Sequence, residues 1–156
     1  MIPIAFYHTQ GETPAALDAT LPPLLEKALK AGHKVLLVTP SESRTHRLDE
    51  TLWTYSATSF LPHASSGGNN DDTQPILLTH ALENLPLLAG RTPVVLAGAE
   101  AALPVLISQN PNKVLYLFNA SQAALEVARP LFKHLKTQGH QVQYWQQTPQ
   151  GSWQQK

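Results

Sequence analysis

Short apolar runs alternate with longer segments of helical periodicity, and this alternation limits the fold more than any other feature. Residues 2–8 form a run of strand-forming residues, and a second buried run covers residues 34–38. Between them, Leu17, Leu21 and Leu25 recur at helical spacing. A strand, a helix and a second strand in this order predict a right-handed crossover onto a parallel sheet.

The same alternation continues to the end of the chain. Further strands are expected at residues 76–79, 93–97, 113–118 and 141–145, and further helices at 41–53, 100–108 and 120–137. The polar stretch 64–73 is expected to be a surface loop. We therefore predict one three-layer α/β/α domain over residues 1–146, with a mostly parallel sheet and a Rossmann-like topology. A polar, loose C-terminal tail is expected over residues 147–156.

Two of the expected helices contain proline, which removes a helical hydrogen bond and clashes with the preceding turn. Pro22 and Pro23 predict either a kink in the first helix or a later start of that helix. Pro130 predicts a kink or restart of the last helix just after Arg129.

Composition excludes several classes of function. The 156 residues fit one domain. The chain has 11 basic and 11 acidic side chains, whereas proteins that bind nucleic acid usually carry a basic excess. Direct nucleic-acid binding is therefore not expected. The absence of cysteine excludes disulfides and thiolate metal sites, and it suits a reducing cytoplasm. Neither a charged leader nor an apolar run of about 20 residues is present, so we expect a cytoplasmic protein without a membrane segment.

The sequence contains none of the motifs that would indicate a cofactor, a metal or catalysis. The first strand-to-helix turn, residues 8–14, has one glycine, and neither G-x-x-x-x-G-K-[ST] nor G-x-G-x-x-G occurs. No two of the seven histidines are spaced i, i+4, and no G-x-S-x-G elbow is present. We therefore expect no cofactor, no metal and no enzymatic activity.

One segment carries a specific resemblance. Residues 47–53 read Arg-Leu-Asp-Glu-Thr-Leu-Trp, and residues 59–63 read Ser-Phe-Leu-Pro-His. This resembles the signature of the chi subunit of bacterial DNA polymerase III, which reads approximately R-L-D-x-x-L-W, a short spacer, then S-F-[LVI]-P-H. The resemblance implies an α/β/α fold without a nucleotide site. It also implies a non-catalytic adaptor that binds the C-terminal tail of single-stranded DNA-binding protein and, in some bacteria, the psi subunit, which joins chi to the clamp loader.

Large aromatic residues in this segment suggest a protein-binding surface. Trp53 and Phe60 flank a short polar stretch near a helix end, and exposed aromatic side chains are favoured interface anchors. With His63 they are our candidates for a surface that receives the psi subunit or another replication or repair partner. The alternative is that both aromatic rings close the end of the core and that His63 only makes local hydrogen bonds.

A second candidate surface lies on the last helix. The tail of single-stranded DNA-binding protein resembles D-D-D-[IL]-P-F in most bacteria, so it requires cations and an apolar slot. By resemblance to the family, Phe118, Arg129, Phe132 and Lys133 fall on the tail-binding positions, while Leu125 stands where the family has a lysine.

The residue types on this helix suit the acidic tail. Arg129, Lys133 and Lys136 are spaced by four and three residues, which places them along one helical face. Arg129 can hold a carboxylate with two parallel hydrogen bonds, a geometry that lysine does not supply. The alternative is an ordinary solvated basic face.

Three functions remain open at this point. The first is an adaptor between single-stranded DNA-binding protein and the replication machinery. The second is a small Rossmann-like nucleotide-binding protein or enzyme, which a binding assay with ATP or NAD would reveal. The third is an interaction module unrelated to replication, which a pull-down with the tail peptide would separate from the first.

Overall fold

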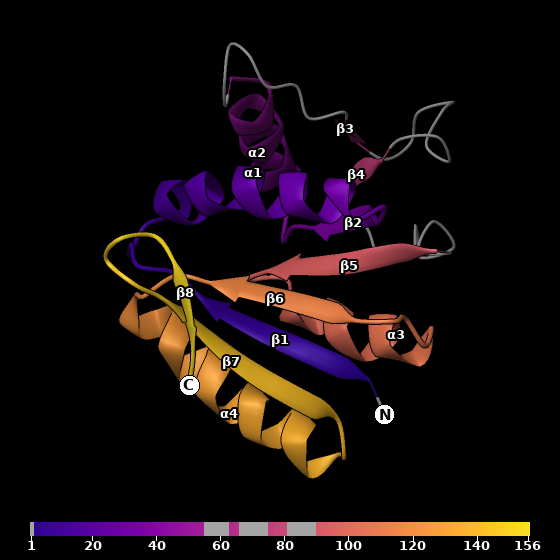
Figure 1. The fold of residues 1–156 in the computed structure, drawn as a ribbon, viewed down its shortest axis with the longest axis vertical. Helices are drawn as coiled ribbons and strands as arrows, with labels where there is room; N and C mark the ends of the chain where they lie inside the picture. Colours follow the sequence, from indigo (N-terminus) through magenta and orange to yellow (C-terminus); the bar gives the residue numbers. More distant parts are fainter. Residues whose placement is uncertain (1, 55–62, 66–74, 81–89) are drawn as a thin grey trace.

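The computed structural model describes residues 2–54, 63–65, 75–80 and 90–156. Its strands form one sheet in the order β3-β4-β2-β5-β6-β1-β7-β8 (Figure 1). The strands are β1 (Pro3–His8), β2 (Lys34–Val38), β3 (His63–Ser65), β4 (Ile76–Thr79), β5 (Arg91–Leu96), β6 (Val114–Phe118), β7 (Gln141–Gln147) and β8 (Trp153–Gln155). All pairs are parallel except β7 with β8.

Helices cover both faces of the sheet. They are α1 (Pro14–Lys30), α2 (Glu42–Thr54), the short 3-10 turn η3 (Glu100–Ala102), α3 (Leu103–Ser108) and α4 (Gln122–Thr137). Figure 1 shows α1 and α2 on one side of the sheet and α3 and α4 on the other. The predicted three-layer α/β/α architecture with a mostly parallel sheet is therefore confirmed.

Each face of the sheet has its own apolar core, because successive side chains of a strand point to opposite faces. Leu17, Leu21 and Leu25 of α1 are buried against one face. Ala128 and Leu135 of α4 are buried against the other. Leu17, Leu21 and Leu25 are spaced by four positions, as the sequence pattern predicted, and Ala128 and Leu135 are seven positions or two helical turns apart, so each set lies on one face of its helix.

Two of the predicted helices can be compared with the structure. The helix expected over residues 41–53 is α2, in which Leu48 and Leu52 are buried, and the Ser41 hydroxyl caps it by accepting a hydrogen bond from the Arg44 amide at 3.2 Å. The helix α1 begins at Pro14 and continues past Pro22, so the later start that we considered does not occur.

The stretch 64–73, which was expected to be a surface loop, begins with two residues of a strand. Residues 64 and 65 belong to β3, which pairs with β4, because the extended chain there lies beside the edge of the sheet. Residues 66–74 lie outside the described part of the chain.

The C-terminal segment is not the loose tail that its polar sequence suggested. β7 continues to Gln147 and turns back into β8, whose residues pair with β7 in antiparallel register. The Trp153 ring packs edge-on against the Tyr7 ring, with centroids 5.0 Å apart. This aromatic contact with β1 gives the hairpin an apolar anchor that the composition of residues 147–156 concealed.

Within the described part of the chain, none of the helices is both long enough and apolar enough to cross a lipid bilayer.

Candidate functional site

The helix α4 runs without interruption from Gln122 to Thr137, and Pro130 lies inside it. Its first turn is capped by the Ser121 hydroxyl, which accepts a hydrogen bond from the Ala124 amide at 3.2 Å. Of the kink or restart that Pro130 predicted after Arg129, the restart therefore does not occur. Burial of Ala128 and Leu135, one on each side of Pro130, holds the two halves of the helix against the same sheet.

The two flanks of α4 differ in character. At about 100° per residue, Phe132, Arg129 and Lys133 share one flank, and His134 and Gln138 share the opposite flank. The Phe132 flank lies toward β7, because its ring meets the Tyr144 ring with centroids 5.8 Å apart. Arg129 and Lys133 are exposed, and Phe132 is half-buried. The structure thus brings three of the four expected tail-binding residues together on one flank of one helix.

Aromatic side chains fill the space between this flank and the sheet. Phe6 packs edge-on against Phe118 and Phe132, with centroids 6.0 and 5.4 Å away. The His8 ring stacks on Phe118 at 5.2 Å with an interplanar angle of 22°. Tyr144 completes the cluster, 5.9 Å from Phe118.

Phe118, the fourth expected residue, occupies a different position from the other three. Its exposed fraction is 0%, so it does not line an open slot by itself. Instead it forms the floor beneath His8 and Tyr144, both of which are half-buried. We define the Arg129 site as Arg129, Phe132, His8, Phe118 and Tyr144.

The charge of Arg129 acts on the polar members of this site. Burial and the nearby Arg129 guanidinium both lower the pKa of His8. Burial raises the pKa of Tyr144, while Arg129 opposes that rise. Among the described residues, no carboxylate forms an ion pair with Arg129 or Lys133. The site therefore presents positive charge beside an aromatic floor, which suits a ligand with a carboxylate and an apolar group.

Leu125 and Lys136 lie on the same flank of α4. Leu125 is half-buried and packs against the apolar core, so it contributes an aliphatic wall to this flank. Lys136 is exposed in the last turn of the helix.

The second expected surface is only partly described. Trp53 lies in the last turn of α2, and His63 begins β3, the edge strand next to β4. Phe60 falls outside the described residues, and of Trp53 and His63 only the backbone is described.

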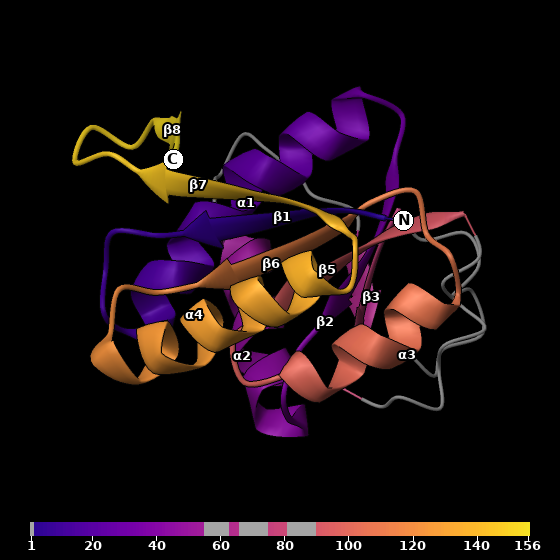
Figure 2. The same cartoon turned by 90° about the horizontal axis from the view of Figure 1, so that it is seen from below.

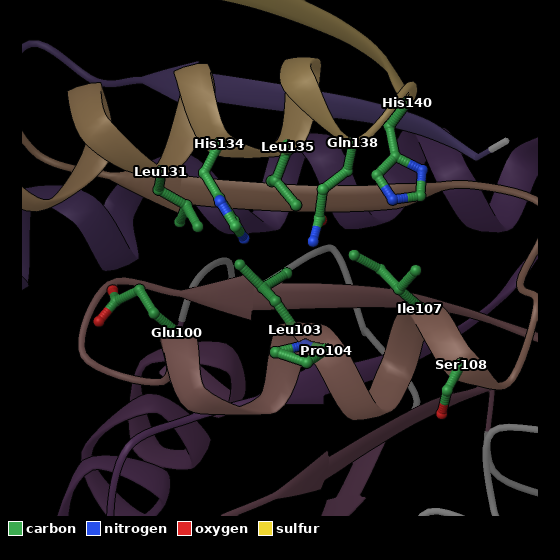
Figure 3. A pocket seen from close by; sticks show the side chains of 10 residues that line it. All are labelled: Glu100, Leu103, Pro104, Ile107, Ser108, Leu131, His134, Leu135, Gln138 and His140. Carbon is green, nitrogen blue, oxygen red and sulfur yellow. The ribbon is translucent and has the colours of Figure 1, made fainter.

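The helices α3 and α4 lie next to each other on one face of the sheet (Figure 2). A groove of about 580 Å³ lies between α3 and the other flank of α4 (Figure 3). Leu103 and Ile107 of α3 face Leu131 and Leu135 of α4 across it (Figure 3). The side chains of His134 and Gln138 also extend from α4 toward α3. No group of three or more metal-ligating side chains occurs among the residues that the structure describes. The groove is lined by both apolar and polar side chains, and it does not share the Arg129 flank of the helix.

The turn between β1 and α1, where a nucleotide-binding fold would hold phosphate, is closed by the chain's own hydrogen bonds. The Thr13 hydroxyl accepts from the Ala16 amide at 3.1 Å. The Gly11 carbonyl accepts from the Ala120 amide at 2.7 Å, and the Gln10 amide donates to the Gln147 side chain at 3.1 Å.

Sequence reasoning missed His8 and Tyr144 as members of the Arg129 site. They are 136 positions apart in the chain, and their side chains are joined by a 2.8 Å hydrogen bond. The pattern of residues predicted both strands but not their pairing, in which Phe6 lies opposite Tyr144 and His8 opposite Gln146. The two side chains meet because β1 pairs with β7, which the sequence pattern does not specify.

Comparison with known proteins gives two matches. The family model described as DNA polymerase III chi subunit, HolC, matches residues 1–143. A probable DNA polymerase III subunit chi from Rickettsia prowazekii (strain Madrid E) is 35% identical over 80 residues, which cover 51% of this chain and 47% of that protein. The alignment thus spans about half of either chain.

Proposed function

This chain belongs to the DNA polymerase III chi subunit family, and we propose that it is a non-catalytic adaptor for the C-terminal tail of single-stranded DNA-binding protein. The observation that carries the proposal is the Arg129 site. An exposed guanidinium without an ion-pair partner among the described residues stands beside an aromatic cluster. An acidic tail that ends in phenylalanine offers the complementary chemistry.

The carboxylates and the terminal ring of the tail match two parts of the site. Arg129 can bind the terminal carboxylate or an aspartate through two parallel hydrogen bonds. Phe132 and Tyr144 offer aromatic edges and faces for the terminal phenylalanine ring. Lys133, one turn further along α4, supplies a second positive charge for the remaining aspartates.

The bridging role is supported by where the two candidate surfaces lie in the sheet. β3, which begins with His63, is separated from β1, which ends with His8, by five strand spacings of about 4.8 Å, or roughly 24 Å. A partner that binds at His63 would therefore leave the Arg129 site open. We propose that this second surface receives the psi subunit or another replication or repair partner, and so links the tail to the clamp loader.

The closed turn between β1 and α1 supports an adaptor over a nucleotide-binding enzyme. A phosphate at a helix N-terminus requires free amide groups. Here Pro14 has no amide proton, and the Ala16 amide is already bound to Thr13. Glu12, just before the helix, would also repel an anion.

Calorimetric titration of a peptide ending in Asp-Asp-Asp-Ile-Pro-Phe against the wild type and Arg129→Ala tests the tail-binding function. We expect wild type to bind and Arg129→Ala to bind at least about tenfold more weakly, because a charge-assisted pair is lost. Wild-type affinity should also fall as salt rises from about 50 to 300 mM.

The matched control is Lys113→Ala, which removes an exposed cation just before β6. It should leave the affinity unchanged. Equal affinity of wild type and Arg129→Ala, or no binding by either, would contradict the proposal.

A further inference from the structure

His8 is the last residue of β1, and two neighbours fix the position of its ring. Its Nδ1 lies 2.8 Å from the Tyr144 hydroxyl oxygen, and its face stacks on Phe118. The side chain is half-buried, and its Nε2 makes no hydrogen bond with any residue in the described ranges. One ring nitrogen is thus held while the other remains available to a ligand.

The topology places Arg129 next to this ring. In a parallel crossover the helix runs opposite to the strands, so a step toward the N-terminus of α4 is a step toward the carboxyl ends of the strands. Phe132 contacts Phe6 at 5.4 Å. Arg129, one turn earlier, therefore lies over the region of His8, two residues beyond Phe6. The effect of the Arg129 charge on both His8 and Tyr144 agrees with this placement.

We propose that the His8 imidazole is a second carboxylate-binding group of the Arg129 site, positioned by Tyr144 and donating from Nε2. The inference rests on the proposed tail-binding function and deepens it. Leu125 on the same flank of α4 is aliphatic and offers no polar contact, so a donor from β1 adds one from the sheet side.

The Tyr144 hydroxyl allows His8 to donate in both of its protonation states. When the ring is neutral and the hydroxyl donates to Nδ1, the proton of the ring is on Nε2 and faces the ligand. When the ring is charged, Nδ1–H donates to the hydroxyl oxygen and Nε2–H still faces the ligand. The ring therefore keeps its position while its charge changes.

The neighbours of His8 set the direction of a pH effect. The groups that face it are the Tyr144 hydroxyl from β7 and the Arg129 guanidinium from α4, while Phe118 of β6 carries no charge. Burial and Arg129 lower the pKa of His8, so the free ring is neutral at neutral pH. A bound carboxylate favours the charged ring and raises that pKa. Binding then takes up a proton, and the affinity rises as the pH falls.

The test is titration of the same tail peptide at pH 6 and pH 8 against wild type and His8→Gln. Carboxylates of the peptide stay ionised over this range. We expect wild type to bind about three- to tenfold more tightly at pH 6, since one unit of pKa change corresponds to about tenfold in affinity. His8→Gln should lose this pH dependence and bind more weakly than wild type at pH 6. His46→Gln, an exposed histidine on α2, is the matched control and should behave as wild type.

A second measurement does not depend on a variant folding well. The pKa of His8, followed by the NMR shifts of its ring in wild type, should rise when the peptide is bound. An unchanged His8 pKa, or full pH dependence in His8→Gln while Arg129→Ala loses binding, would overturn the role of His8 and leave tail binding intact. If wild type and Arg129→Ala bind equally, or neither binds, the tail-binding function fails and the role of His8 fails with it.

Discussion

Asp18 of α1 and Arg44 of α2 form a buried ion pair in which both terminal nitrogens of the guanidinium donate to the carboxylate. The two hydrogen bonds measure 2.7 and 2.6 Å, and the side chains are only 4% and 10% exposed. The pair fixes the two helices that cover one face of the sheet relative to each other. Because each charge is desolvated, either partner left alone would be costly.

We predict that Asp18→Ala lowers the free energy of unfolding by about 3–5 kcal/mol, because it leaves the Arg44 charge buried and unpaired. Urea denaturation followed by circular dichroism measures this change. The matched variant Asp18→Leu with Arg44→Met removes both charges and should cost clearly less than Asp18→Ala. A double variant at least as unstable as the single one would contradict this explanation.

Tyr116 gives a prediction about alkaline stability. Its ring is fully buried, and its hydroxyl donates to Glu100 Oε2 at 2.7 Å. Burial, this hydrogen bond and the Glu100 charge all raise the pKa of Tyr116 well above its ordinary value. The unfolded chain then loses the tyrosine proton first, so the stability from this group is present below about pH 10 and falls as the pH rises above it.

The slope above pH 10 should be about 1.4 kcal/mol per pH unit for this group. Tyr116→Phe should reduce the slope by that amount and cost about 1–3 kcal/mol at pH 8, because the hydrogen bond to a charged acceptor is lost. Urea unfolding at pH 8, 10 and 11 tests both points. An unchanged slope in Tyr116→Phe would show that other groups control the alkaline transition.

The C-terminal hairpin should contribute measurable stability. We predict that Trp153→Ala lowers the free energy of unfolding by about 1–2 kcal/mol, because it removes the edge-on contact with Tyr7 and buried apolar area. Gln154→Ala, at an exposed position of the same strand, is the control and should change stability by less than about 0.5 kcal/mol. Equal effects of the two substitutions would argue against an aromatic anchor.

Leu125→Lys should strengthen tail binding. The new side chain would extend from the Arg129 flank of α4, and its ammonium group can reach solvent while its stem keeps part of the leucine packing. We expect about a three- to tenfold gain in affinity at low salt and a smaller gain at higher salt. Ala123→Lys, at an exposed position on another face of α4, controls for net charge. A gain of the same size in both variants would point to general electrostatic attraction.

Substitutions in one proposed surface should leave binding at the other unchanged. Trp53→Ala and Phe60→Ala should abolish binding of the psi subunit or of an equivalent replication partner, because aromatic anchors dominate interfaces. Both variants should keep wild-type affinity for the tail peptide, since the Arg129 site lies in another part of the sheet. Thermal unfolding checks their stability. If both variants unfold, the two rings belong to the core, and the second surface lies elsewhere.

Local features of the chain were readable from the sequence because they depend on neighbouring residues. The alternation of short apolar runs with segments of helical periodicity predicted the three layers of the α/β/α fold. Helical periodicity predicted a helix over residues 41–53, which is observed as α2. The segment from Arg47 to His63 indicated the family that the comparisons confirm.

Prolines and polar composition indicated local tendencies only, and packing decided the outcome. Pro130 alone favours a break, yet burial of Ala128 and Leu135 keeps α4 continuous and keeps Arg129 above the aromatic cluster. The polar segment after Gln147 suggests disorder, yet pairing with β7 and the contact between Trp153 and Tyr7 make it part of the sheet.

Sequence by itself therefore determined the fold class, the family and the basic flank of the last helix, since each depends on residues close together in the chain. The tertiary structure alone decided that His8 meets Tyr144 and that Asp18 meets Arg44. Such contacts join residues that are distant in sequence, and they depend on strand order and helix docking. Strand order and helix docking follow from packing of the whole chain, because the sequence of one short segment does not specify which other segment it packs against.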